Sequence, residues 1–202
     1  NSQAWHRRND SNSQLGISDA ALKDDIEFAK QIVLLQWWQH ERDKQGSPFI
    51  FTVENPRATI EAHPLTRKCL LLPRAAGGLG GKARHFTNCW FPSSASKVHR
   101  KPGVLISNNK TLLDDFANGK YMCRESSQCP RRAAGRKHDK LEGASCTAAG
   151  SFSPELADHL ARLTAREESR LNGKTSCAAA SASAPALSYT APVSPREILL
   201  EA

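Results

Sequence analysis

An apolar run that ends abruptly in an acid, an amide and a proline constrains the fold more than any other feature of the chain. The run from Phe49 to Val53 has the aromatic and β-branched content of a buried strand. Glu54 and Asn55 follow at once, and Pro56 then stops the strand because proline lacks a backbone donor. Open α/β sheets bind ligands at the rim beyond the carboxyl ends of their strands, so the pattern favours a ligand site at Glu54 and Asn55. The alternative is that both side chains only cap a turn.

The composition limits the class of protein. With 202 residues and 39% hydrophobic residues, the chain is long enough for one domain and further segments. Its net charge of +8, from 28 Lys and Arg against 20 Asp and Glu, favours an anionic partner such as nucleic acid. No apolar run approaches the ~20 residues that span a bilayer, so no membrane partner is expected. Six irregularly spaced cysteines do not form a disulfide framework, which indicates an intracellular location, nuclear in a eukaryote.

A helix is predicted from Ser18 to about Lys44, after an irregular segment over residues 1–17. Its apolar residues follow one stripe at helical spacing, namely Leu22, Ile26, Ala29, Val33 and Trp37. The pair Trp37 and Trp38 also suggests stacking against nucleic-acid bases. Because Trp37 lies on the stripe, packing against the rest of the protein is the favoured prediction.

The remaining pattern alternates short apolar runs with helical segments, as in an α/β fold. Buried strands are predicted over 49–53, 69–72, 85–91 and 103–107, and helices over 111–118 and 153–171. Ser153 and Pro154 have the residue types of an N-cap and a first helical position. The glycine-rich stretch 77–81 lacks the Lys-Ser/Thr of a P-loop and is predicted to be a flexible loop. Residues 173–202 are rich in Ala and Ser and are predicted to be a disordered tail.

Cysteine spacing gives a weak metal signal. Cys123 and Cys129 form a C-x5-C pair, with Cys89, His138 and Cys146 elsewhere in the same part of the chain. Zinc sites need about four nitrogen or sulfur ligands and usually pair them at shorter spacing. Reduced, unpaired thiols are therefore the favoured prediction, and a zinc site with Cys123 and Cys129 as ligands is the alternative.

The order of the motifs resembles the C-terminal half of a divergent group of cytosine-5 DNA methyltransferase-like proteins of phages and mobile elements. The resemblance covers residues ~20–165 and is carried by the series as a whole. Its motifs are Gly-x-x-Phe-x-Phe-x-Val-Glu-Asn-Pro (46–56), His-Phe-Thr-Asn-Cys-Trp-Phe (85–91), Arg-Lys-Pro-Gly-Val-Leu-Ile-Ser-Asn (100–108), Met-Cys-x5-Cys (122–129) and Phe-x-Pro-Glu-Leu (152–156).

The resemblance implies a partial Rossmann-like methyltransferase sheet over residues 18–172. It also implies S-adenosylmethionine as the cofactor of an intact parent protein, and DNA as the partner. Glu54 and Asn55 match the element that contacts the pyrimidine edge of a flipped cytosine and helps to protonate it. The basic residues Lys97, Arg100, Lys101, Arg131 and Arg132 are expected to contact phosphates, which positions a nucleic acid without reading its sequence.

The chain also departs from that family. No Pro-Cys pair precedes Glu54, the glycine-rich cofactor loop is missing, and Gly103 replaces the usual Thr. The expected explanation is a fragment without catalytic activity, because the nucleophile and the cofactor site would lie upstream of Asn1. Two other hypotheses stay open. The chain is either a non-catalytic, basic nucleic-acid-binding module of a mobile-element polyprotein, or a degenerate reading frame without activity.

Overall fold

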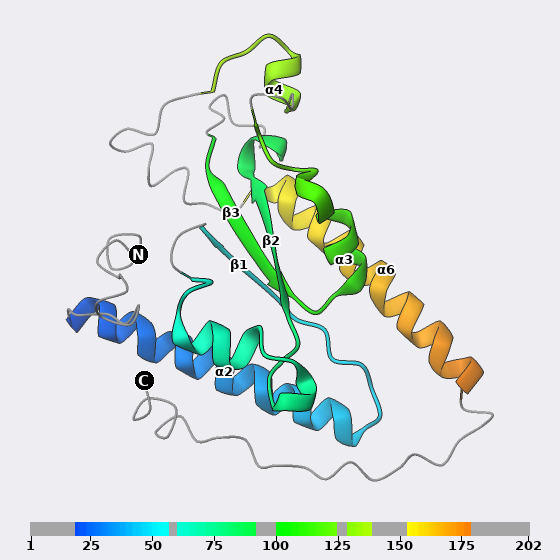
Figure 1. The fold of residues 1–202 in the computed structure, drawn as a ribbon. Coiled ribbons are helices and arrows are strands. Elements are labelled where there is room, and N and C mark those ends of the chain that lie inside the picture. Colours follow the sequence, from blue (N-terminus) through cyan, green and yellow to red (C-terminus); the bar gives the residue numbers. More distant parts are fainter. Residues whose placement is uncertain (1–18, 57–59, 92–99, 125–128, 139–152, 179–202) are drawn as a thin grey trace.

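The computed structural model describes residues 19–56, 60–91, 100–124, 129–138 and 153–178 (Figure 1). The predicted irregular segment over 1–17 and most of the predicted disordered tail, residues 179–202, lie outside the described residues. The elements in chain order are the helix α2 (Asp19–Lys44), the strand β1 (Thr52–Pro56), a π-helical turn (Thr66–Leu70), a 3₁₀ turn (Arg74–Ala76), the strand β2 (Lys82–Thr87), a 3₁₀ turn (Asn88–Trp90), the strand β3 (Pro102–Ser107), the helix α3 (Lys110–Asp115), a 3₁₀ turn (Ala117–Gly119), the helix α4 (Pro130–Ala133) and the helix α6 (Pro154–Ala178).

The three strands form one antiparallel sheet in the order β1-β3-β2. The central strand β3 is the most apolar, and it pairs Val53 with Ile106 on one side and Phe86 with Gly103 on the other. Asn108 extends the pairing beyond β1, because its Oδ1 accepts from the Phe51 N–H at 3.0 Å and its Nδ2 donates to the Phe49 carbonyl at 2.9 Å. The strand predicted at 49–53 therefore begins later, at Thr52, and includes Glu54 and Asn55 instead of ending before them.

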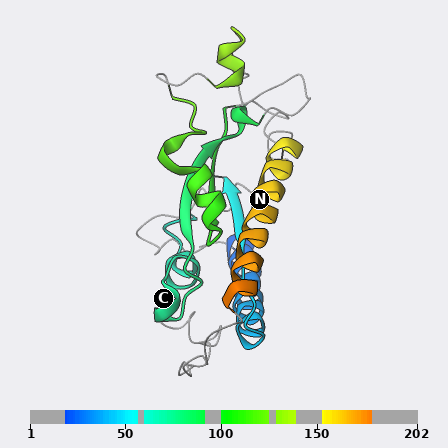
Figure 2. The ribbon, with the colours of Figure 1, turned by 90° about the vertical axis from the view of Figure 1, so that its right-hand side faces the viewer.

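Helices cover both faces of the sheet. Successive side chains of β3 point to opposite faces, so this strand contributes to two cores. Val104 and Ile106 join a core with Phe28 and Ile32 of α2. Leu105 joins a second core on the other face, together with Leu112 of α3 and Leu156 of α6. Figure 2 shows α6 running along one side of the sheet and α4 standing beyond one end of it. The mixed α/β class is thus confirmed; its Rossmann-like character stays a prediction, since these three strands are all antiparallel and Rossmann sheets are mainly parallel.

The long helix was placed correctly, but its predicted buried stripe was wrong. Leu22, Ile26 and Trp37 are 50%, 40% and 53% exposed. The buried residues of α2, which are Asp25, Phe28, Ala29 and Ile32, centre roughly a quarter of a turn away on the helix surface, so Ala29 is the one member of the predicted stripe that is buried. A buried polar pair fixes this orientation. The Leu65 N–H donates to Nδ1 of His63, so Nε2 of the same ring donates to Oδ1 of Asp25, at 3.1 Å.

The prediction of a strand over 69–72 was also wrong. Cys69 and Leu70 are buried, as expected, but they belong to a π-helical turn. The glycine-rich stretch after it is pinned, because the N–H groups of Leu79 and Gly81 donate to the carbonyls of Cys69 and Leu70 at 2.7 Å each. A short apolar run does not distinguish a strand from a buried turn, and here Leu79 packs back onto the turn.

The other helices follow their local signals. At the start of α6, Ser153 Oγ accepts from the Leu156 N–H at 3.3 Å and Pro154 is the first helical residue, as predicted. Asn109 caps α3 by accepting from the Leu112 N–H at 2.9 Å. The helix α6 continues to Ala178, several residues beyond the predicted end at Leu171, so it includes the first residues of the predicted tail. Within the described residues, no helix combines the length and the apolar character needed to cross a membrane.

Candidate metal centre

Four side chains with metal-binding atoms meet beyond one end of the sheet. The sulfurs of Cys89, Cys123 and Cys129 and a ring nitrogen of His138 all lie within 4.8 Å of one another. Nε2 of His138 is 3.3 Å from Cys129 Sγ and 3.7 Å from Cys123 Sγ. The three cysteines are buried and none of them forms a disulfide.

The end of β2 brings two of the cysteines together. Cys89 lies in the 3₁₀ turn that directly follows β2. Thr87, the last residue of β2, donates its N–H to the Tyr121 carbonyl at 2.9 Å, and its Oγ1 accepts from the Cys123 N–H at 3.0 Å. These two bonds hold the segment 121–123 against the strand end, so the Cys89 and Cys123 sulfurs face the same point.

The short helix α4 supplies the other two groups. Cys129 is its N-cap residue and Pro130 its first residue, a position that proline favours. The chain then reverses at Gly135, which has a φ of 69° and therefore a left-handed conformation that glycine adopts without strain. Nε of Arg131 donates to the Lys137 carbonyl at 2.5 Å across this reversal. As a result His138 returns beside Cys129.

The electrostatics of the cluster favour a bound cation. Burial raises the pKa of the Cys89 thiol above its usual range, and the neighbouring Cys129 and Cys123 raise it further. Burial acts in the same direction on Cys129, but hydrogen bonds from the backbone N–H groups of Arg132 and Arg131 prevail and lower the pKa of this thiol. The thiolate form is thus favoured at Cys129 and disfavoured at Cys89, and a bound divalent cation would favour the thiolate form of its ligands.

The donor set fits zinc. Three sulfurs and one imidazole nitrogen are a common ligand set of structural zinc sites. Tetrahedral zinc, with a Zn–S length of about 2.3 Å and a Zn–N length of about 2.0 Å, places a sulfur and a nitrogen ligand about 3.5 Å apart. The two sulfur-to-nitrogen distances of 3.3 and 3.7 Å lie on either side of this value. Trp90 packs against the cysteines, and its buried indole N–H has no hydrogen-bond partner among the described residues, which leaves a donor beside the sulfurs.

The pair predicted from its spacing, Cys123 and Cys129, is therefore brought into one cluster. Cys89 and His138 were noticed in the sequence but not selected as ligands. Two local signals point to them once the fold is known. Cys89 lies two residues after the end of β2, and His138 completes a C-x5-C-x8-H series. Cys146 lies outside the described residues.

The predicted base contacts, Glu54 and Asn55, lie on the edge strand β1. Burial raises the pKa of Glu54, and the positive charge of Lys101 opposes this effect. Because they are successive residues of a strand, their side chains point to opposite faces of the sheet. The structure therefore does not direct both groups at a single base.

The predicted phosphate contacts divide between two places. Arg100 and Lys101 precede β3, and the Lys101 carbonyl accepts from the Asn88 N–H at 2.9 Å, next to Cys89. Arg131 and Arg132 lie on α4, in the segment that carries Cys129 and His138. Lys97 lies outside the described residues. Four of the five predicted cations thus lie on segments that adjoin the metal-binding groups.

Known proteins add nothing to this geometry. Comparisons of the chain with family models, curated proteins and solved structures found no match.

Proposed function

We propose that the chain is a zinc-stabilised module that binds nucleic acid through basic residues next to the metal. The observation that carries the proposal is the cluster of Cys89, Cys123, Cys129 and His138, whose ligand atoms lie within 4.8 Å of one another. Zinc in such a site acts structurally, because four protein ligands leave no open position for a substrate.

The surface around the cluster supports an anionic partner. Over residues 131–137 the chain carries Arg131, Arg132, Arg136 and Lys137 without an acidic residue. Arg132, Arg136 and Lys137 make no ion pair with any residue that the structure describes. Unpaired cations on a protein with a net charge of +8 attract phosphates and release the counterions of a nucleic acid. The zinc would hold these cations in place, because it joins α4 to the strand end.

Metal analysis of the purified full chain tests the first half of the proposal. We expect one zinc per chain, and cobalt in its place should give the visible absorption of a tetrahedral thiolate complex. Cys129→Ala should abolish both. Cys69→Ala is the matched control, because Cys69 is equally a buried thiol without a disulfide but lies in the core against α2. Equal metal contents in the two variants would refute the site.

Nucleic-acid binding tests the second half. The zinc-loaded chain should bind a DNA duplex or a single strand with an affinity that falls steeply as salt is raised. Replacing Arg131 and Arg132 with Gln should weaken binding to both forms. Replacing Lys23 and Lys30, which are cations on α2 away from the cluster, is the control. Salt-independent binding, or an equal loss in the control, would contradict the proposal.

A methyltransferase-like identity is a second proposal, with DNA as its substrate and S-adenosylmethionine as its cofactor. One observation supports it: Glu54 is a half-buried carboxyl whose pKa is raised by burial, and such a group keeps a proton more readily for donation to a base. Its Rossmann-like fold and its cofactor site belong to this proposal alone. Because the nucleophile and the cofactor loop are expected before Asn1, the test is the reading frame upstream of this chain. A frame that carries neither a Pro-Cys pair nor a glycine-rich loop would remove this proposal.

A further inference from the structure

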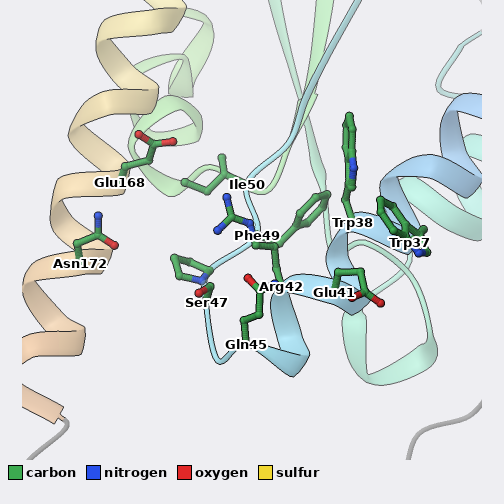
Figure 3. A pocket seen from close by; sticks show the side chains of 11 residues that line it. Trp37, Trp38, Glu41, Arg42, Gln45, Ser47, Phe49, Ile50, Glu168 and Asn172 are labelled. Carbon is green, nitrogen blue, oxygen red and sulfur yellow. The ribbon is translucent and has the colours of Figure 1, made fainter.

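A hollow of about 670 Å³ opens where the C-terminal end of α2 leads into β1 and faces α6 (Figure 3). Three aromatic residues line it, namely Trp37, Trp38 and Phe49. Hollows of this size suit small organic ligands or parts of larger ones. We call it the tryptophan hollow; it lies at the opposite end of the sheet from α4 and the metal-binding cluster (Figure 1).

Both indoles of the tryptophan hollow face solvent. Trp37 is 53% exposed and Trp38 is 47% exposed, because other residues of α2, among them Phe28 and Ile32, form its buried face. Two adjacent exposed tryptophans are unusual on a protein surface, where large aromatic side chains normally lose most of their exposure. Packing among the residues that the structure describes therefore does not account for this pair.

Three polar side chains that bond to no described residue also line the hollow. Figure 3 shows the Arg42 side chain reaching up beside Phe49 and Ile50, while Glu168 and Asn172 stand on the opposite wall, on α6. None of Arg42, Glu168 and Asn172 makes a side-chain hydrogen bond or ion pair with a described residue. Glu41, by contrast, is held by Lys44 at 2.8 Å.

We propose that the tryptophan hollow binds an unpaired nucleobase of single-stranded nucleic acid. This inference rests on the proposed nucleic-acid function and names the form of nucleic acid that is bound. An indole stacks on the face of any base. The Arg42 guanidinium, beside Phe49 in the same hollow, can contact the adjoining phosphate.

Two other occupants are outcomes of the test. A cationic ligand would be attracted to the aromatic faces and to the carboxylates of Glu41 and Glu168, and it would be repelled by Arg42. A base inside a duplex has both faces covered by its neighbours and would have to be extracted before it reached Trp37 or Trp38. Single strands present their bases without that cost.

The test measures fluorescence anisotropy of labelled 12-residue DNA probes with the zinc-loaded full chain. The probes are a single strand, the duplex of the same sequence, and a strand of the same length in which every base is removed. Replacing Trp37 and Trp38 together with Ala should weaken binding of the single strand about tenfold or more, the loss expected for a stacked base. Binding of the abasic strand should not change.

Two further variants separate stacking from folding. Trp38→Phe keeps an aromatic ring and should retain most of the affinity for the single strand. Leu34→Ala removes an apolar side chain that is 45% exposed on the same helix but does not line the hollow, and it should have no effect.

The outcomes are distinct. If the single strand binds the double variant as well as the original chain, the inference is overturned while the proposed function stands. The inference is also overturned if all three probes lose affinity equally, or if tetramethylammonium chloride displaces the single strand more than sodium chloride does. If the original chain binds none of the probes, the inference and the proposed function fail together.

Discussion

Glu167 ties α6 to α3, and its replacement by Gln should remove a pH-dependent part of the stability. The carboxylate is buried and accepts from the Thr111 N–H at 3.2 Å and from Thr111 Oγ1 at 2.6 Å, and it also pairs with Arg170. Its bond with Arg170, assisted by those with Thr111, lowers its pKa to about 2. A group whose pKa is lower in the folded chain stabilises that chain above its unfolded pKa of about 4.3, and the contribution is lost as the pH falls toward 2.

The magnitude follows from the shift. A decrease of roughly two units corresponds to about 3 kcal/mol, and screening by solvent at the partly exposed Arg170 reduces this to about 2 kcal/mol. Urea unfolding of the original chain and of Glu167→Gln should therefore differ by about 2 kcal/mol at pH 7 and by less than half of that at pH 3. Glu168→Gln is the control, since this neighbour is exposed and makes no bond with a described residue. A difference between Glu167→Gln and the original chain that stays constant from pH 7 to pH 3 would refute the reasoning.

Three other predictions follow from the packing and from the metal-binding cluster. A Cβ on Gly103 would lie 2.4 Å from the Phe86 ring, so Gly103→Ala should destabilise the chain by about 1–3 kcal/mol in urea unfolding, and Phe86→Leu should recover part of the loss. Leu70→Ala should lower the free energy of unfolding by about 2–5 kcal/mol, because Leu70 is fully buried. Leu34→Ala should change it by less than about 0.5 kcal/mol, because Leu34 lies on the exposed face of α2, and equal effects would contradict that exposure. Chelation of zinc should speed amide hydrogen exchange over 130–138 and leave β3 protected, and a uniform increase would show that the metal holds the whole fold.

Local chemistry predicted where helices begin. Ser153 followed by Pro154 provides a capping hydroxyl and a residue without a backbone donor, and both act within one turn of α6. The long helix at Asp19–Lys44 was also predicted from local sequence, since no proline interrupts it. Such signals depend on neighbours in the sequence, so they are visible before the fold is known.

Which face of a helix is buried depends on distant residues. The stripe through Leu22, Ile26 and Trp37 was a regular apolar pattern, yet the helix is turned so that the polar Asp25 is buried. The partner that makes this burial possible is His63, which lies in another segment and donates to the carboxylate at 3.1 Å. Periodicity alone does not show that a buried acid has a partner, and so it favoured the wrong stripe.

The metal-binding cluster was predictable only in part, for a similar reason. Cys123 and Cys129 are close in sequence, but Cys89 reaches them because β2 ends at Thr87 and the segment 121–123 is hydrogen-bonded to that end. No spacing rule contains this meeting of a strand end with a distant loop. The Met-Cys-x5-Cys motif of the methyltransferase-like resemblance contains Cys123 and Cys129, but a motif does not show what these residues contact.

The position of the cluster bears on how the module would work. Its four ligands come from three segments, and α4 packs against the 3₁₀ turn Asn88–Trp90 that carries Cys89. The two apolar cores that hold the sheet between its helices contain none of these ligands. A metal in this place therefore acts less on the sheet than on α4, which carries Arg131 and Arg132. Since phosphate contacts require cations at fixed positions, the zinc would control the ordering of the basic surface, and with it the affinity for nucleic acid.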